Sequence, residues 1–123
     1  MKKLFYFPLI GFCFLFSLCG KEGPGGKAAI KGMVMHHSKP IPGAAVYIKY
    51  NASESPGTNV TYYDDHVNAD ANANFEFQDL KRGDYFLFGA GYDSSIALPV
   101  TGGVPVIIKK KTETVQSNVL VTE

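Results

Sequence analysis

Histidines and aspartates are the side chains of this sequence that could bind a metal ion. His36 and His37 are adjacent, and adjacent residues of a regular strand point to opposite faces, so a strand cannot present both to one metal. His66 lies in residues 64–72, which also hold Asp64, Asp65 and Asp70. Carboxylates in a loop can bind Ca²⁺, but this stretch lacks the glycine and glutamate of an EF-hand loop. We therefore interpret residues 64–72 as polar turns and predict no metal site and no cofactor.

Nucleophilic catalysis has no better support. The chain contains no Gly-x-Ser-x-Gly elbow, and Ser94 and Ser95 lie in a glycine-rich stretch that is typical of a loop. Both cysteines, Cys13 and Cys19, lie near the N-terminus, so the remainder of the chain has neither a thiol nucleophile nor a disulfide. We predict that the protein is not an enzyme.

Two polar, tyrosine-containing stretches are the candidate ligand-binding loops. Loops on a rigid β-scaffold often carry binding sites, and tyrosine beside carboxylates suits the stacking and hydrogen bonding of sugars. The alternative is that these tyrosines pack inward and the neighbouring glycines only turn corners. The candidate residues are Tyr62, Tyr63, Asp64 and Asp65 in the first stretch, and Tyr92 and Asp93 in the second.

The elements that must position these residues have a periodicity of two, which predicts strands. Short alternating segments separated by polar or Pro/Gly-containing connections favour an antiparallel β-sandwich. The expected strands are residues 28–35, 44–50, 61–69, 75–77, 85–88, 104–108 and 115–121. The residues expected to face the core are Ile30, Val34, Val46, Ile48, Phe75, Phe77, Tyr85, Leu87, Val106, Ile108, Val119 and Val121.

Three segments carry a resemblance to a known family. Residues 30–34 with 39–46, residues 69–77 with their Asp-containing turn before Phe75-Glu76-Phe77, and the Leu-x-x-Gly-x-Tyr-x-Leu corner at 80–87 resemble carboxypeptidase regulatory-like domains. These domains share the prealbumin-like (transthyretin-like) sandwich with Cna B-type repeats. The resemblance implies an all-β, seven-stranded antiparallel Greek-key β-sandwich over residues 29–123.

The same resemblance carries two residue-level expectations. The family usually has glycine where this chain has Ala73, so Asn72 or Asn74 is expected to take the left-handed conformation of the turn. Cna B-type domains join a lysine to an asparagine by an isopeptide bond, and Lys31 and Asn118 could occupy those positions. No acid follows the corner to catalyse that bond, so we expect Lys31 to be an ordinary solvated residue.

The N-terminus is typical of a secretory signal. Two lysines precede an apolar run, residues 4–18, that contains five phenylalanines and is too short to span a membrane comfortably. Phe16-Ser17-Leu18-Cys19 resembles a bacterial lipobox, although Leu18 stands where Gly or Ala is usual. We predict a lipoprotein signal peptide at residues 1–18 and lipidation of Cys19, followed by a flexible tether at 19–28. The alternatives are a buried N-terminal segment and an unmodified cysteine in an ordinary signal peptide.

The charge balance of the chain bears on the class of partner that it could bind. Residues 19–123 carry 10 basic and 11 acidic side chains, and this near-neutral balance argues against nucleic-acid binding. The sequence predicts a monomeric, non-catalytic lipoprotein of the Gram-negative cell envelope, anchored in the outer membrane, that binds a protein or glycan or acts as a spacer. The alternative is an accessory subunit of a separate envelope hydrolase or transporter.

Overall fold

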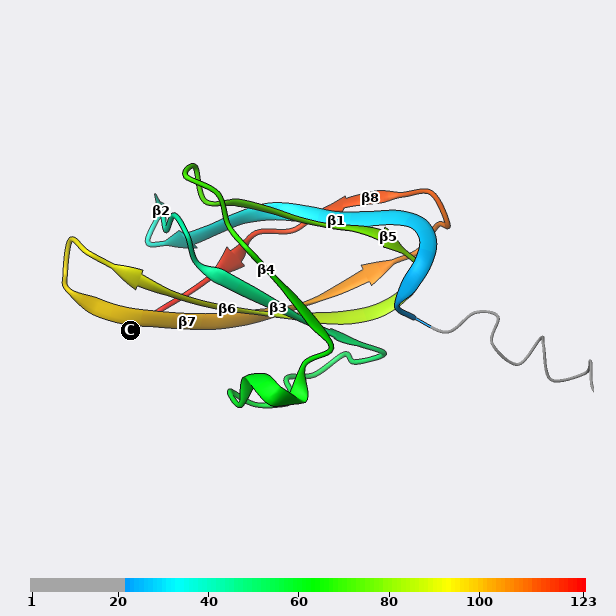
Figure 1. Ribbon diagram of the computed structural model, residues 1–123, viewed down its shortest axis with the longest axis horizontal. Helices are drawn as coiled ribbons and strands as arrows, with labels where there is room; N and C mark the ends of the chain where they lie inside the picture. The colour runs from blue at the N-terminus through cyan, green and yellow to red at the C-terminus, as the bar shows by residue number, and fades with distance from the viewer. Residues whose placement is uncertain (1–21) are drawn as a thin grey trace, which may run out of the picture.

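The computed structural model describes residues 22–123, which form two packed β-sheets (Figure 1). The predicted signal peptide and Cys19 lie outside the described residues. Among residues 22–123, no helix is long and apolar enough to cross a membrane. The strands are β1 (Pro24–His36), β2 (Lys39–Pro40), β3 (Ala45–Tyr50), β4 (Asp65–Asn68), β5 (Asn74–Leu80), β6 (Gly83–Asp93), β7 (Leu98–Ile108), β8 (Thr114–Gln116) and β9 (Val119–Leu120); a short 3₁₀ helix, η2, spans Val60–Tyr62.

One sheet is built around β1, and the other has the order β4-β3-β6-β7. β1 pairs antiparallel with β2 and β5, whereas β8 and β9 pair with it in parallel. β8 and β9 are the two parts of the predicted C-terminal strand, so the seven predicted segments are all present, with two-residue β2 added. Among the described strands the pairing is antiparallel except at β8 and β9. The all-β sandwich itself is confirmed.

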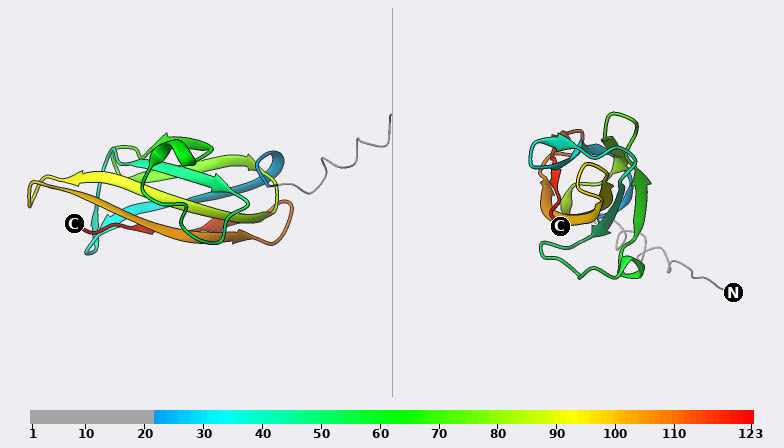
Figure 2. Two further views of the ribbon diagram at one scale, coloured as in Figure 1. Left: turned by 90° about the horizontal axis from the view of Figure 1, so that it is seen from below. Right: turned by 90° about the vertical axis from the view of Figure 1, so that its left-hand side faces the viewer.

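The buried apolar side chains form one core between the two sheets, whose strands the end-on view in Figure 2 shows around the interior. All twelve residues predicted to face inward are buried. Alternation explains this result, because every second side chain of a strand faces the opposite sheet. Each large apolar side chain buried in this way contributes about 1.5–3 kcal/mol to stability.

The expected tether does not extend through residue 28. β1 begins at Pro24, and the backbone N–H of Lys81 donates a 2.9 Å hydrogen bond to the carbonyl of Gly23. Gly26 packs so closely that a Cβ there would lie 2.1 Å from the carbonyl oxygen of Leu80. From Glu22 onward the segment belongs to the sandwich, because its glycines permit backbone packing that side chains would block.

The second predicted loop, which contains Tyr92 and Asp93, is mostly strand. The glycine-rich residues on either side of it belong to β6 and β7. These strands pair continuously from Gly83↔Ile108 to Asp93↔Leu98 and leave only residues 94–97 as the turn. Glycine is required here for close packing rather than for turning. A Cβ on Gly102 would lie 2.1 Å from the carbonyl oxygen of Leu120.

The turn before β5 also differs from the expectation. Ala73, rather than Asn72 or Asn74, has the left-handed conformation, with φ of 67°. The Asp70 carboxylate accepts hydrogen bonds from the backbone N–H groups of Asn72 and Asn74, at 2.8 and 2.9 Å. These bonds fix the turn so that the strained position falls on the residue between the two donors.

Candidate functional site

A row of aromatic rings crosses the outer face of the β4-β3-β6-β7 sheet. Tyr47 on β3 is directly opposite His66 on β4 and Phe88 on β6, so the three side chains share one face. The ring centroids of Tyr47 and His66 are 5.3 Å apart and stacked, and those of Tyr47 and Phe88 are 6.3 Å apart. We call Tyr47, Tyr63, His66 and Phe88 the aromatic row.

Tyr63 completes the aromatic row from the loop that precedes β4. Its ring stacks on Phe88 with centroids 5.6 Å apart, and its hydroxyl donates a 2.7 Å hydrogen bond to the carbonyl of Gly57. Phe88 is only 6 % exposed although it points away from the core, because this loop and its neighbours cover it. His66 is exposed, and Tyr47 and Tyr63 are half-buried, so their rings present a partly solvent-accessible surface.

The other predicted residues of the first loop lie beside the aromatic row. Tyr62 is 56 % exposed at the end of η2. The Asp64 carboxylate accepts a 2.7 Å hydrogen bond from the backbone N–H of Tyr50, and Asp65 accepts one from the N–H of His66. Both aspartate side chains remain exposed, so each carboxylate keeps lone pairs that can accept further hydrogen bonds.

The second predicted pair, Tyr92 and Asp93, lies at the other end of the sheet. β3 pairs with residues 85–90 of β6, so Tyr92 and Asp93 extend beyond the Ala45 end of β3, whereas Asp65 pairs with Ile48 near the opposite end. Tyr92 is 56 % exposed, but Asp93 is only 3 % exposed. The structure therefore does not bring the two predicted loops together into one site.

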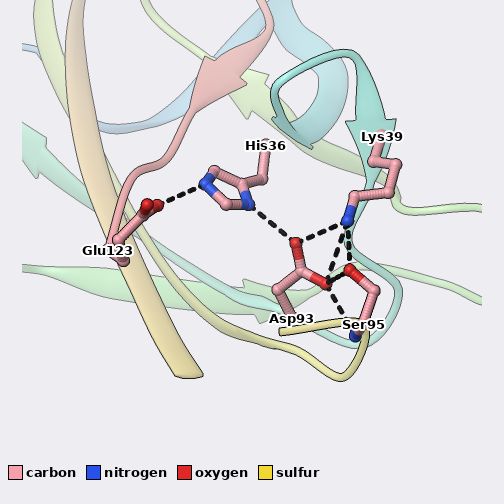
Figure 3. A network of polar contacts seen from close by, with 5 residues as sticks. All are labelled: His36, Lys39, Asp93, Ser95 and Glu123. Carbon is pink, nitrogen blue, oxygen red and sulfur yellow. Dashed lines mark hydrogen bonds and ion pairs between the residues drawn. The ribbon is translucent and has the colours of Figure 1, made fainter. Parts of the chain in front are cut away.

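Asp93 belongs to a buried polar network with His36 (Figure 3). Oδ2 of Asp93 lies 2.7 Å from Nδ1 of His36, and Oε1 of Glu123 lies 2.6 Å from Nε2 of the same ring. Lys39 forms an ion pair with Asp93, with 2.9 Å between Nζ and Oδ2. Ser95 donates to Asp93 Oδ1 through its hydroxyl, at 2.6 Å, and through its backbone N–H, at 2.9 Å.

The Ser, His and Asp of this network are not arranged as a catalytic triad. In a triad the serine hydroxyl donates to the imidazole, which acts as its base. Here the Ser95 hydroxyl donates to Asp93, and both imidazole nitrogens of His36 face carboxylates. The imidazole is therefore not available to activate Ser95.

The network shifts the pKa values of its members in opposite directions. The hydrogen bond to Asp93, assisted by Glu123, raises the pKa of His36 above its ordinary value against the opposing effect of burial. Hydrogen bonds from Ser95, His36 and Lys39 hold the pKa of Asp93 well below its usual range. His36 is therefore stabilised as an imidazolium ion between two carboxylates.

These shifts predict a stability maximum in mildly acidic solution. The raised pKa of His36 stabilises the fold fully below the unfolded-state value of about 6.5, and this contribution is lost as pH rises through the folded-state pKa. The lowered pKa of Asp93 stabilises the fold above about pH 4, and this contribution is lost on acidification.

Urea unfolding across this range, with a chelator present, should show stability falling on both sides of about pH 4–6.5. His36→Gln should flatten the alkaline fall and His66→Gln should not; an unchanged alkaline fall in His36→Gln would contradict the assignment.

A polar groove of about 660 Å³ lies beside β4 and β5. Its lining includes the side chains of Lys31, Asn68, Asp70 and Gln116. Lys31 is exposed there, as expected. Asn118 uses its side-chain oxygen to accept a 3.0 Å hydrogen bond from the backbone N–H of Met33, so it has a structural role in joining β1 to β9.

Sequence reasoning missed the aromatic row and the buried network. The sequence places Tyr47 and Phe88 on strands without marking them as site residues, and it offers His36 only as one of two adjacent histidines that a regular strand would point to opposite faces. Consecutive aromatics in Tyr85-Phe86-Leu87-Phe88 were the available signal for the row, because they show that both faces of β6 are covered. Nothing in the sequence signals the network, since Asp93 and Glu123 are 57 and 87 positions from His36.

Comparisons with known proteins identify a fold. No protein-family model and no curated protein sequence matches the chain. Among solved structures, it is similar to a candidate carbohydrate-binding protein of Pseudomonas aeruginosa, with a TM-score of 0.56 and 14 % identity over 92 % of this chain and 99 % of the other. It is also similar to the major pilin subunit of Bacillus cereus, with a TM-score of 0.54 and 14 % identity over 80 % of this chain.

The chain spans 30 % of the pilin subunit's length, so that likeness concerns one part of the pilin. Neither structure is named as an enzyme. At this level of identity the likenesses concern architecture alone. Together with the sheet pairing described above, they show that this chain has a prealbumin-like β-sandwich fold.

Proposed function

We propose that this protein is a non-catalytic envelope lipoprotein whose sandwich binds neutral glycans on the aromatic row. The observation that carries the proposal is the cross-strand alignment of Tyr47 with His66 and Phe88, with Tyr63 stacked beside them. The fold shared with a candidate carbohydrate-binding protein over nearly its whole length supports the same function.

The chemistry of the row suits a sugar ring. One face of a pyranose is lined by C–H groups, which pack on the negative face of an aromatic ring, while its hydroxyls need hydrogen-bond partners at the edge. Tyr47 and His66 supply the stacking surface, and the exposed carboxylates of Asp64 and Asp65 supply acceptors beside it. Among the described residues Lys49 forms an ion pair with Asp64, with 3.6 Å between Nζ and Oδ2, so Asp65 carries the unpaired negative charge that disfavours acidic sugars, and the proposed ligand class is neutral.

Tyr47→Ala is expected to weaken glycan binding at least tenfold, because it removes the centre of the row. His66→Ala should weaken it less, since Tyr47, Tyr63 and Phe88 remain. The measurement is binding of the full-length protein to an array of neutral and acidic oligosaccharides, followed by titration of each neutral oligosaccharide that binds.

Tyr92→Ala is the control, because Tyr92 is a solvent-exposed tyrosine of the same sheet that lies at its other end. It should leave binding unchanged. Equal binding by Tyr47→Ala and the wild type would refute the row as the glycan site, and binding confined to acidic oligosaccharides would refute the ligand class.

The membrane tether in this proposal is short. Lipidation of Cys19 leaves two residues between the anchor and Glu22, where the described fold begins. At about 3.3–3.6 Å per extended residue, the three steps from Cys19 to Glu22 span roughly 10 Å at most. The end of the sandwich where β1 begins would therefore lie close to the lipid headgroups, with the C-terminus toward the other end of the molecule (Figure 1).

The anchor has its own test. The mature protein extracted from bacterial membranes should have the mass of residues 19–123 plus two or three acyl chains, and Cys19→Ser should abolish that addition while Cys13→Ser should not. An unmodified mass would contradict the lipoprotein assignment without affecting the glycan proposal. A soluble secreted sandwich would then take its place.

A further inference from the structure

His36, His37 and Glu123 gather where β1 ends, at the end of the sandwich opposite the start of β1 at Pro24. Each offers one metal-binding atom, and the three atoms lie within 4.8 Å of one another. The imidazole rings of His36 and His37 are 4.3 Å apart between centroids. Two imidazoles and a carboxylate form a ligand set that zinc sites use.

The adjacent histidines come together because the strand ends between them. His36 is the last residue of β1, and His37 and Ser38 form a two-residue turn into β2 with φ values of 51° and 71°. Both residues of a type I′ hairpin turn have positive φ, so His37 no longer follows the alternation of β1. The expectation that these side chains face apart assumed regular strand geometry, and the turn overturns that premise.

His36 already has the support that a metal-binding histidine needs. Such a histidine usually donates its second ring N–H to a carboxylate, which orients the ring and fixes its tautomer. Asp93 accepts from Nδ1 of His36 at 2.7 Å and is itself held by Lys39 and Ser95. The remaining nitrogen, Nε2, faces Glu123 from a ring that is only 2 % exposed.

The contact between His36 Nε2 and Glu123 Oε1, at 2.6 Å, needs a positive charge or a proton between the two atoms. A proton satisfies it in the metal-free protein. Zn²⁺ can replace that proton if the two atoms separate to about 3.3 Å, the spacing of tetrahedral ligands at about 2.0–2.2 Å from the ion. Glu123 can move outward because its side chain is 48 % exposed. Because His37 is exposed too, the fourth coordination position of the metal ion is open to water.

We propose that His36, His37 and Glu123 bind a divalent transition-metal ion of the Zn²⁺ class, with Asp93 positioning His36. Imidazole ligands favour zinc, copper and nickel over calcium and magnesium, which prefer oxygen ligands. The site is separate from the aromatic row and does not depend on the proposed glycan binding. Uptake of the metal releases the proton shared by His36 and Glu123 into solution.

The test is calorimetric titration of the full-length protein with ZnCl₂, in detergent, without a polyhistidine tag and after removal of metal. We expect one zinc ion per chain. His37→Asn and Glu123→Gln should each weaken zinc binding at least tenfold, and Asp93→Asn should weaken it about 10–100-fold through the orientation of His36. Asparagine is chosen at position 37 because it tolerates the left-handed conformation of the turn. Calcium should not compete.

His66→Asn is the matched control, because it removes a histidine that lies outside this cluster, and it should bind zinc like the wild type. Urea unfolding in chelator shows that each variant is folded before it is titrated. Absence of zinc binding by the wild type would overturn the proposal. So would unchanged affinity in folded His37→Asn and Glu123→Gln, or loss of binding in His66→Asn.

Discussion

Replacing Tyr85 with phenylalanine is expected to lower the free energy of unfolding by about 2–3 kcal/mol. The Tyr85 hydroxyl accepts a 2.9 Å hydrogen bond from the backbone N–H of Gly23 and donates one of 2.5 Å to the carbonyl of Lys81. Tyr85 is fully buried, so phenylalanine would leave both backbone groups without their partner. Buried, unsatisfied polar groups cost about 1–3 kcal/mol each.

Chemical denaturation of Tyr85→Phe beside the wild type measures this effect, and Tyr92→Phe is the control because Tyr92 is exposed. Amide hydrogen exchange should also accelerate at residues 23–28, because Tyr85 links this segment to the core. A loss smaller than about 0.5 kcal/mol, equal to the control, would show that residues 22–28 are only loosely attached. The expectation of a tether through residue 28 would then be restored.

Gly32→Ala is expected to destabilise the fold by about 2–3 kcal/mol, through the attachment of the C-terminal segment to β1. The chain crosses Gly32 between β8 and β9, and a Cβ there would lie 1.9 Å from the carbonyl oxygen of Ser117. A backbone group must move to accommodate it. That movement would strain the hydrogen bonds from Ser117 N–H to the Lys31 carbonyl and from Met33 N–H to Asn118.

Lys31→Ala is the neighbouring control, because it alters an exposed side chain on the same strand and leaves the backbone contact intact. Urea unfolding should place this control within about 0.5 kcal/mol of the wild type. If Gly32→Ala were as stable as Lys31→Ala, the close approach of β1 and the C-terminal segment would not exist.

The core could be predicted because alternation in each strand is a local property. Ile30 and Val34 on β1 face Val46 and Ile48 on β3 from opposite sheets, and the apolar positions alone indicate this. The strands β6 and β7 are longer than the sequence predicts. Glycine usually weakens a strand, so their glycine-containing parts were expected to be loops. Gly89 and Gly91 lie within β6 because close neighbours occupy the space that side chains would need; a Cβ on Gly91 would lie 2.8 Å from Ile41.

The candidate sites were less predictable because they depend on contacts distant in sequence. Tyr63 was singled out from the sequence, but Tyr47 and Phe88 were not, since the register of three strands decides that they meet. Asp93 was expected on an exposed loop. It is buried because β6 continues to residue 93 and places its carboxylate against His36.

The surfaces of this protein have a consistent order along the molecule. The start of β1 follows the predicted lipid anchor in sequence, the aromatic row lies on one sheet face, and the His36 network, which Figure 3 shows, includes the C-terminal residue Glu123. A tethered sandwich arranged in this way would hold its network away from the membrane. The outer face of the β4-β3-β6-β7 sheet, which carries the aromatic row, would run along the side of the tethered molecule and stay accessible to a glycan.

The most direct test of the glycan-binding proposal is an NMR titration that follows the aromatic ring resonances of the full-length protein in detergent. The probe is the neutral oligosaccharide that binds best on the array. We predict that the ring signals of Tyr47, Tyr63 and His66 shift with one saturating binding curve, while those of Tyr92 stay unchanged. Shifts confined to Tyr92, or no shift of Tyr47 at saturating oligosaccharide, would contradict the account.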